Sequence, residues 1–319
     1  MHTTKSPNNS GQTPYRIEYQ PQLIEDAVLC AIAGHPEENT FRKERDELYE
    51  CADDDTREIA FQDMHQRWFS HLELGSPVGQ IFELWPILVA STHRCLLLKA
   101  RSKKGIGAEL YVAPEESVQS ESEQRTIIIQ LTPELLCQSR RLLDFLRYEL
   151  LHIVDMLDPN FGYEPDFPET PAGPSYDHFL QRRYSVLWDM TIDGRLYQKG
   201  WLPPSVREKH WTTFRDVFPG AEKELERMFT HFFDQGPHTH HDLMSFAQNP
   251  EKWIGTTPEA TTKGPCGLCH FPSFHLINPV QLLPDLLTKI HQEYPAWSLT
   301  EPICQQCVDL YDSRPSSTV

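Results

Sequence analysis

Several features that mark common functional classes are missing from this sequence. The 319 residues contain only 29 Lys and Arg against 46 Asp and Glu, a formal charge of −17. Such a chain repels nucleic-acid phosphates and anionic lipids, so we expect neither nucleic-acid nor membrane binding. No apolar run approaches the ~20 residues that a membrane helix requires. The N-terminus also lacks the apolar stretch of a signal peptide, which predicts a cytoplasmic protein.

Two common catalytic motifs are absent as well. Lys104-Gly105-Ile106-Gly107 does not have the spacing of a phosphate-binding loop, and no Gly-x-Ser-x-Gly nucleophile elbow occurs. The chain is nevertheless 39% apolar and 11% aromatic, which is sufficient for a folded core. These observations favour an acidic globular protein without a P-loop or a serine-hydrolase site.

Cysteines near the C-terminus give the clearest chemical signal. Cys266 and Cys269 form one Cys-x-x-Cys pair, and Cys304 and Cys307 form a second pair after 34 intervening residues. Four thiolates from two such turns can close a tetrahedral Zn²⁺ site that has no open position, so we expect a structural zinc. Cys266–His270 also matches the c-type haem pattern, but the second cysteine pair favours zinc.

The remaining cysteines and the segment composition suggest the organisation of the chain. Cys30, Cys51, Cys95 and Cys137 are far apart in sequence, and we expect them to be reduced and buried. The predicted segments are a disordered tail (1–14), a helical N-terminal region (15–90), a core (91–235), a linker with a short helix and exposed histidines (236–263), the Cys₄ module (264–312) and a second tail (313–319).

The core combines strand and helix patterns. Strands are predicted at Thr92–Ala100, Ile106–Ala113 and Arg125–Leu131, and helices at Thr132–Leu157, Tyr176–Gln198 and Ala221–Phe233. The expected fold class is therefore α+β: a helix-rich domain with a small sheet, followed by a small Cys₄ module.

The helix from Thr132 to Leu157 carries the candidate active site. Its helical spacing places Tyr148, Glu149, His152 and Asp155 on one arc, away from the leucine stripe. Such an arrangement can direct a base and a metal ligand into a cleft.

This pattern resembles the His-Glu-x-x-His helix of the zincin metallopeptidases, whose preceding sheet binds extended peptide at an edge strand. The gluzincin branch of that family also takes an acidic ligand from a later helix. A catalytic domain followed by a cysteine module is similar, in addition, to the Spartan-type proteases. The resemblance covers roughly residues 92–200 and implies a zincin-like fold with a cleft beside the Arg125–Leu131 strand.

The resemblance assigns a role to each matching residue. Glu149 corresponds to the general base, His152 to a zinc ligand and Asp189 to the third protein ligand. Asp193 corresponds to the acceptor that orients His152, and Asp158 is an alternative third ligand. A second Zn²⁺ at His152 is thereby implied.

Tyr148 is the main departure from the motif, because it stands where the first histidine is required. A neutral phenol is a poor zinc ligand, which leaves three outcomes: a degenerate fold without catalytic metal, an altered site that uses Tyr148 or another histidine, or no zincin fold at all. The sequence therefore predicts a metallopeptidase-like protein with a modified or lost catalytic zinc site and a zinc-ribbon-like module, acting on a protein or peptide. The alternative is a non-catalytic zinc-containing interaction or adaptor protein.

Overall fold

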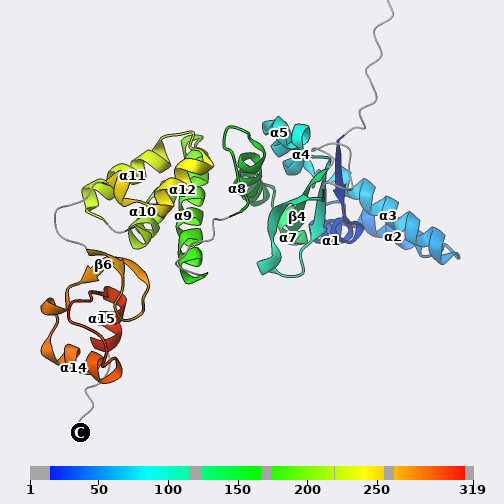
Figure 1. Ribbon diagram of the computed structural model, residues 1–319. Coiled ribbons are helices and arrows are strands. Elements are labelled where there is room, and N and C mark those ends of the chain that lie inside the picture. Colours follow the sequence, from blue (N-terminus) through cyan, green and yellow to red (C-terminus); the bar gives the residue numbers. More distant parts are fainter. Residues whose placement is uncertain (1–14, 115–123, 167–173, 219, 255–261, 313–319) are drawn as a thin grey trace, which may run out of the picture. The chain divides into compact units, whose positions relative to one another are not determined.

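The computed structural model describes residues 15–114, 124–166, 174–218, 220–254 and 262–312 (Figure 1). Contacts divide the chain into two compact units, Met1–Tyr163 and Glu164–Val319. The tails predicted at 1–14 and 313–319 lie outside the described residues. None of the described helices is long and apolar enough to cross a bilayer.

The N-terminal unit contains a four-stranded mixed sheet. Its strands are β1 (Arg16–Tyr19), β2 (Arg94–Lys99), β3 (Gly107–Val112) and β4 (Arg125–Leu131), in the order β1-β2-β4-β3. β1, β2 and β4 are parallel, whereas β3 runs antiparallel to β4 at the edge. The three predicted strands are confirmed, and β1 is an addition. β4 (Arg125–Leu131) pairs with a strand on each side, so a peptide cannot add to the sheet beside it as the prediction requires. The edge strand on that side of the sheet is β3.

Helices surround this sheet and complete one core. They are α1 (Pro21–Ile32), α2 (Glu38–Leu48), α3 (Asp54–His71), α4 (Ser76–Leu84), α5 (Pro86–Ser91), α7 (Pro133–Leu136) and α8 (Ser139–Leu157), with a 3₁₀ turn at Lys103–Gly105. Leu23 of α1, Ile129 of β4 and Leu146 of α8 belong to the same buried cluster and are fully inaccessible. The region 15–90 is therefore not a separate helical domain, because its apolar faces are buried against β2, β4 and α8.

The predicted helix from Thr132 to Leu157 is interrupted. Gln138 has ψ 73°, outside the helical region, so the chain turns between α7 and α8. This turn lets α7 pack against α1 while α8 packs against α4 and α5. The leucine stripe on α8 is confirmed, since Leu142, Leu146 and Leu150 are completely buried.

The C-terminal unit begins with a helical bundle made of α9 (Pro174–Gln198), α10 (Ser205–Val217), α11 (Glu222–Asp234), α12 (His240–Gln248) and α13 (Glu251–Ile254). Phe214, Phe229 and Phe246 are buried at its centre. Gly194 permits a close approach of α9 to α11, because a Cβ at this position would lie 2.2 Å from the Phe233 carbonyl oxygen. The predicted core 91–235 is thus divided between two units, since α8 and α9 belong to different sets of packed helices.

The predicted linker 236–263 contains a short helix, as expected, but this helix, α12, packs against α9 and belongs to the bundle. Thr239 and Asp242 form a reciprocal capping box at the start of α12. His240 is buried and hydrogen-bonded to the Tyr184 hydroxyl at 2.7 Å, rather than exposed. Residues 255–261, which complete the predicted linker, lie outside the described part.

The cysteine-containing segment has a small sheet of its own. β5 (Thr262–Pro265), β6 (Pro272–Ile277) and β7 (Ile303–Cys304) pair antiparallel in that order. A 3₁₀ turn at Pro279–Gln281 and two helices, α14 (Pro284–Glu293) and α15 (Gln305–Asp312), complete it. Ile290, Trp297 and Ile303 are buried in a separate apolar cluster. Helices thus dominate over small sheets, which confirms the α+β class.

The other four cysteines are reduced, as expected, but they are not all buried. Cys95 is buried, Cys51 and Cys137 are half-buried, and Cys30 is exposed. Cys137 follows α7 and contacts Cys30 of α1; burial, with a contribution from Cys30, raises the pKa of Cys137 to about 12. The expectation of burial is wrong for Cys30 because α1 turns this residue away from the sheet that it covers.

Shortening a side chain at the centre of the α8 stripe should destabilise the N-terminal unit. Leu146→Ala leaves a cavity at a fully buried position, and we expect the free energy of unfolding to fall by about 2–5 kcal/mol. Hydrogen exchange of β4 amides measures this loss. Leu84→Ala, at a position that is 39% exposed, is the matched control and should change stability by less than about 1 kcal/mol. Equal effects would contradict the packing described.

Candidate metal centre

Two turns of the cysteine-containing segment present the four thiols. The turn between β5 and β6 carries Cys266 and Cys269, and it is closed by the His270 amide, which donates to the Cys266 carbonyl at 2.8 Å. Cys304 ends β7, and Cys307 lies in the first turn of α15. Leu276 of β6 pairs with Cys304, so the strand pairing brings the second turn beside the first.

Gly267 allows the first turn to pack closely against the chain that precedes β7. Its amide donates to the Pro302 carbonyl at 2.8 Å. A Cβ at this position would lie 2.7 Å from Glu301 Cβ and 2.8 Å from Trp297 Nε1. The first position between Cys266 and Cys269 therefore requires glycine, because a larger residue would push the two cysteine pairs apart.

The spacing of the sulfur atoms fits a tetrahedral metal site. All four Sγ atoms lie within 4.8 Å of one another. Cys266 Sγ is 3.8 Å from Cys307 Sγ, and Cys269 Sγ is 3.8 Å from Cys304 Sγ. A Zn²⁺ ion with Zn–S bonds of about 2.3 Å requires sulfur atoms about 3.8 Å apart. The four cysteines can therefore hold a metal ion such as zinc with little rearrangement.

Backbone amides support negative charge on the first cysteine. Burial by itself raises the pKa of Cys266, but amides of Cys269, Cys304 and Leu268 outweigh it and hold that pKa below its usual value. The Cys304 and Leu268 amides lie 3.2 and 3.4 Å from Cys266 Sγ. Amides that point at sulfur disperse the charge of a metal-bound thiolate.

A four-sulfur shell leaves no coordination position for water or substrate. A metal bound here would supply a cross-link between the β5–β6 turn and the β7–α15 turn. The remaining support for this fold is the small cluster around Ile290, Trp297 and Ile303. The arrangement is suited to a structural role.

The candidate catalytic residues on α8 have defined neighbours. Glu149 accepts a hydrogen bond from the Ala108 amide of the edge strand β3, with Oε2 at 3.2 Å. His152 Nδ1 donates to the Tyr148 carbonyl oxygen at 3.0 Å, and the two rings lie edge to face with centroids 4.9 Å apart. Because the carbonyl can only accept, a neutral His152 carries its lone pair on Nε2.

The acidic candidates lie at two different places. Asp158 follows α8, and its Oδ1 accepts from the amide and the side chain of Asn160 at 2.9 Å each. Asp189 and Asp193 lie on α9, in the other compact unit. Asp193 Oδ2 is 2.7 Å from His210 Nε2 on α10, so it orients a histidine of its own unit.

Within the described part of residues 15–163, no group of three His, Cys, Asp or Glu side chains is close enough to share a metal. The roles assigned to Glu149, His152, Tyr148, Asp189 and Asp193 therefore remain predictions. Sequence reasoning did not find the contacts to Ala108 and His210. Both arise from packing between distant segments and have no local sequence signal.

Comparisons of the chain with protein-family models, with curated proteins and with solved structures find no match. The interpretation of this protein consequently depends on its own residues and geometry.

Removing the metal should loosen the cysteine-containing segment alone. We expect a chelator, or Cys266→Ser, to release one zinc per chain and to accelerate hydrogen exchange across 262–312, because the small core needs the cross-link. β4 should remain protected, and Cys51→Ser should change neither quantity. Unchanged exchange after complete loss of zinc would show that the segment folds without the metal.

The hydrogen bond between Glu149 and Ala108 gives a separate prediction. Glu149→Ala removes the acceptor, so exchange of the Ala108 amide should accelerate about tenfold, as expected for the loss of a hydrogen bond to a charged group. Glu149→Gln keeps a side-chain oxygen and should preserve most of the protection. The measurement is residue-resolved hydrogen exchange. If both variants behave alike, the contact does not hold β3 to α8.

Proposed function

We propose that this protein is metallopeptidase-like and has lost its catalytic zinc, so that it binds a protein or peptide without cleaving it. The Cys₄ site would be its one zinc site, with a purely structural role. One observation carries this proposal: Glu149 accepts a hydrogen bond from the Ala108 amide of the edge strand. In an active peptidase of this type, Glu149 would instead be the general base.

The sheet supports the zincin-like part of the proposal. Three parallel strands and an antiparallel edge strand precede the helix that carries Glu149 and His152. The Ala113 amide donates a hydrogen bond to the Gln124 carbonyl, next to the antiparallel pairing of β3 with β4. Because backbone groups alternate in direction along a strand, those of the odd-numbered residues of β3 point toward β4. The backbone groups of Leu110 and Val112 consequently point outward, where an extended peptide can pair with them.

The ligand set supports loss of the catalytic metal. Tyr148 replaces the first histidine of the motif, and in the N-terminal unit the described residues near His152 offer no group of three metal-binding side chains. His152 alone cannot retain zinc against water. In the proposed protein, α8 keeps the position of a catalytic helix but stabilises the sheet.

Metal analysis separates the outcomes. Protein purified without chelator should contain one zinc per chain, and His152→Ala should leave this number unchanged, whereas Cys266→Ser should reduce it toward zero. A peptide library incubated with the wild type should remain uncleaved.

Two zincs per chain in the wild type, falling to one in His152→Ala, would refute the loss of the catalytic metal. That result would instead favour an active peptidase with an altered ligand set. Glu149→Gln would then be the variant that distinguishes a general base from a structural acceptor, since it should abolish cleavage while keeping the second zinc.

A further inference from the structure

A surface cavity of about 470 Å³ lies between α1, α2 and α3, and no residue of α8 lines it. β1 contributes Tyr19 to its wall, and the loop after α2 contributes Tyr49. The proposed function does not use this cavity, and its lining combines aromatic rings with carboxylates.

Aromatic rings form the first kind. Tyr49 and Phe61 meet edge to face, with centroids 5.1 Å apart, and Phe61 stacks with His65 at 6.3 Å. Tyr49 is 63% exposed although it is a large ring. Ring faces that remain accessible at a cavity attract cations through their quadrupole.

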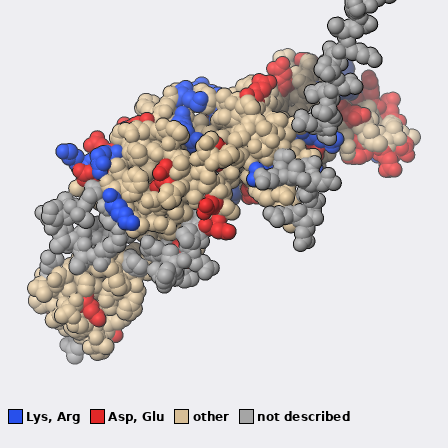
Figure 2. All heavy atoms as spheres, turned by 45° about the horizontal axis from the view of Figure 1, so that its top comes forward, with Lys and Arg blue, Asp and Glu red and all other residues tan. Residues whose placement is uncertain are grey.

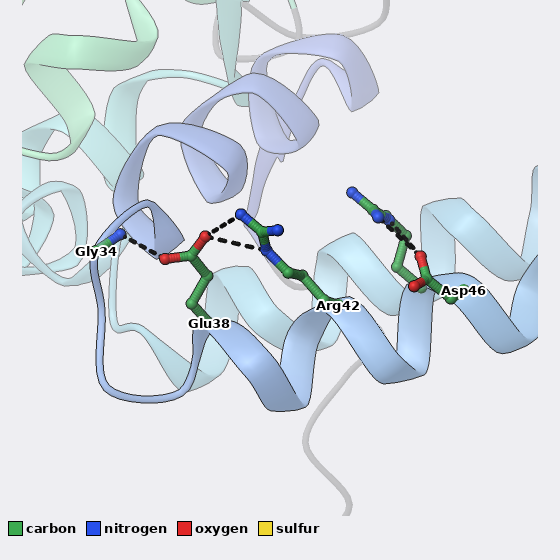
Figure 3. A network of polar contacts seen from close by, with 5 residues as sticks. Gly34, Glu38, Arg42 and Asp46 are labelled. Atoms are coloured by element: carbon green, nitrogen blue, oxygen red, sulfur yellow. Dashed lines mark hydrogen bonds and ion pairs between the residues drawn. The ribbon is translucent and has the colours of Figure 1, made fainter.

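Carboxylates form the second kind. Glu25 of α1 and Glu58 and Asp63 of α3 line the cavity. Its only cationic lining residue within the described chain is Arg45, which is bound to Asp46 at 2.7 Å. Figure 3 shows that Arg42 on the same helix is likewise engaged, by Glu38. Arg42 and Arg45 are thus each paired with a carboxylate of their own helix.

The surrounding surface is acidic too. Residues 37–67 contain eleven Asp and Glu against five Lys and Arg. Figure 2 shows these carboxylates gathered at the end of the unit formed by α2 and α3. Such a field attracts cations toward the cavity and repels anions.

His65 provides a third, independent observation. Its ring lines the cavity and is only 6% exposed, and its Nε2 is buried with no hydrogen-bond partner among the described residues. Burial lowers the pKa of His65, although the nearby Glu25 and Glu58 act in the opposite direction. A buried polar nitrogen without a hydrogen-bond partner is uncommon in folded proteins and marks His65 as an unusual residue of the cavity wall.

The geometry selects among cations. The described carboxylates and His65 do not form a group compact enough to chelate one metal ion. A wider organic cation can contact several of them together while its methylene groups lie on Tyr49 and Phe61. We propose that this cavity binds an alkylammonium group, whether on a lysine side chain of a partner or on a free small amine.

Saturation-transfer NMR with the zinc-loaded full chain tests this proposal. The probes are Nα-acetyl-lysine methylamide, choline and Nα-acetyl-norleucine methylamide, which keeps the apolar chain but lacks the ammonium. We expect the lysine derivative or choline to bind and the norleucine derivative to bind at least about tenfold more weakly, because the charge supplies most of the attraction.

Matched variants locate the binding site. The double variant Glu25→Gln, Glu58→Gln should weaken binding about tenfold through the loss of two charges, and Tyr49→Ala about two- to fivefold. The control Glu47→Gln, Glu50→Gln removes the same charge from exposed positions that do not line the cavity and should leave affinity within about twofold.

Equal binding of the lysine and norleucine derivatives would overturn the proposal, as would an absence of binding by all three probes. An unchanged affinity in Glu25→Gln, Glu58→Gln would overturn it too, because binding would then occur elsewhere. A preference for the lysine derivative over choline identifies a primary ammonium group such as that of a lysine side chain, and the reverse preference identifies a free quaternary ammonium compound. None of these substitutions should change the zinc content of the protein. A negative result in the binding experiment can therefore be told apart from a failure of the proposed function, which is tested by zinc content.

Discussion

The burial of β4 is the constraint on which the N-terminal unit depends. β4 pairs with β2 on one side and with β3 on the other, and its Ile127, Ile129 and Leu131 are completely inaccessible. An apolar strand in this position must be covered, and the leucine stripe of α8 belongs to the same core. Once α8 is fixed, Glu149 comes within hydrogen-bond distance of β3, and Tyr148 and His152 take their positions beside it.

The cysteine-containing segment is limited by its small size rather than by an apolar strand that must be covered. It spans about 50 residues, a size at which a single apolar core seldom provides enough stability. Strand pairing between β6 and β7 brings four sulfur atoms together at distances that match a tetrahedral ion. A metal ion held by all four sulfur atoms would stabilise this segment and would have no open position for a substrate.

Carboxylates have contrasting surroundings in this acidic protein. Glu149 is tied to a backbone amide, and Asp193 is tied to a histidine, so both serve packing between segments. Glu25, Glu58 and Asp63 instead face a cavity beside aromatic rings. The same residue type thus stabilises the fold at one place and creates a cation-attracting surface at another, according to what lies opposite.

The sequence by itself determined the features that depend on local spacing: the cysteine pairs, three of the strands and the apolar stripe of α8. Only the tertiary structure decided the features that depend on contacts between distant segments. These include β1 beside β2, the absence of a boundary near residue 90, the burial of His240 and the cavity around His65. The physical reason is that periodicity and turn chemistry act over a few residues, whereas burial of a side chain depends on which segment packs against it.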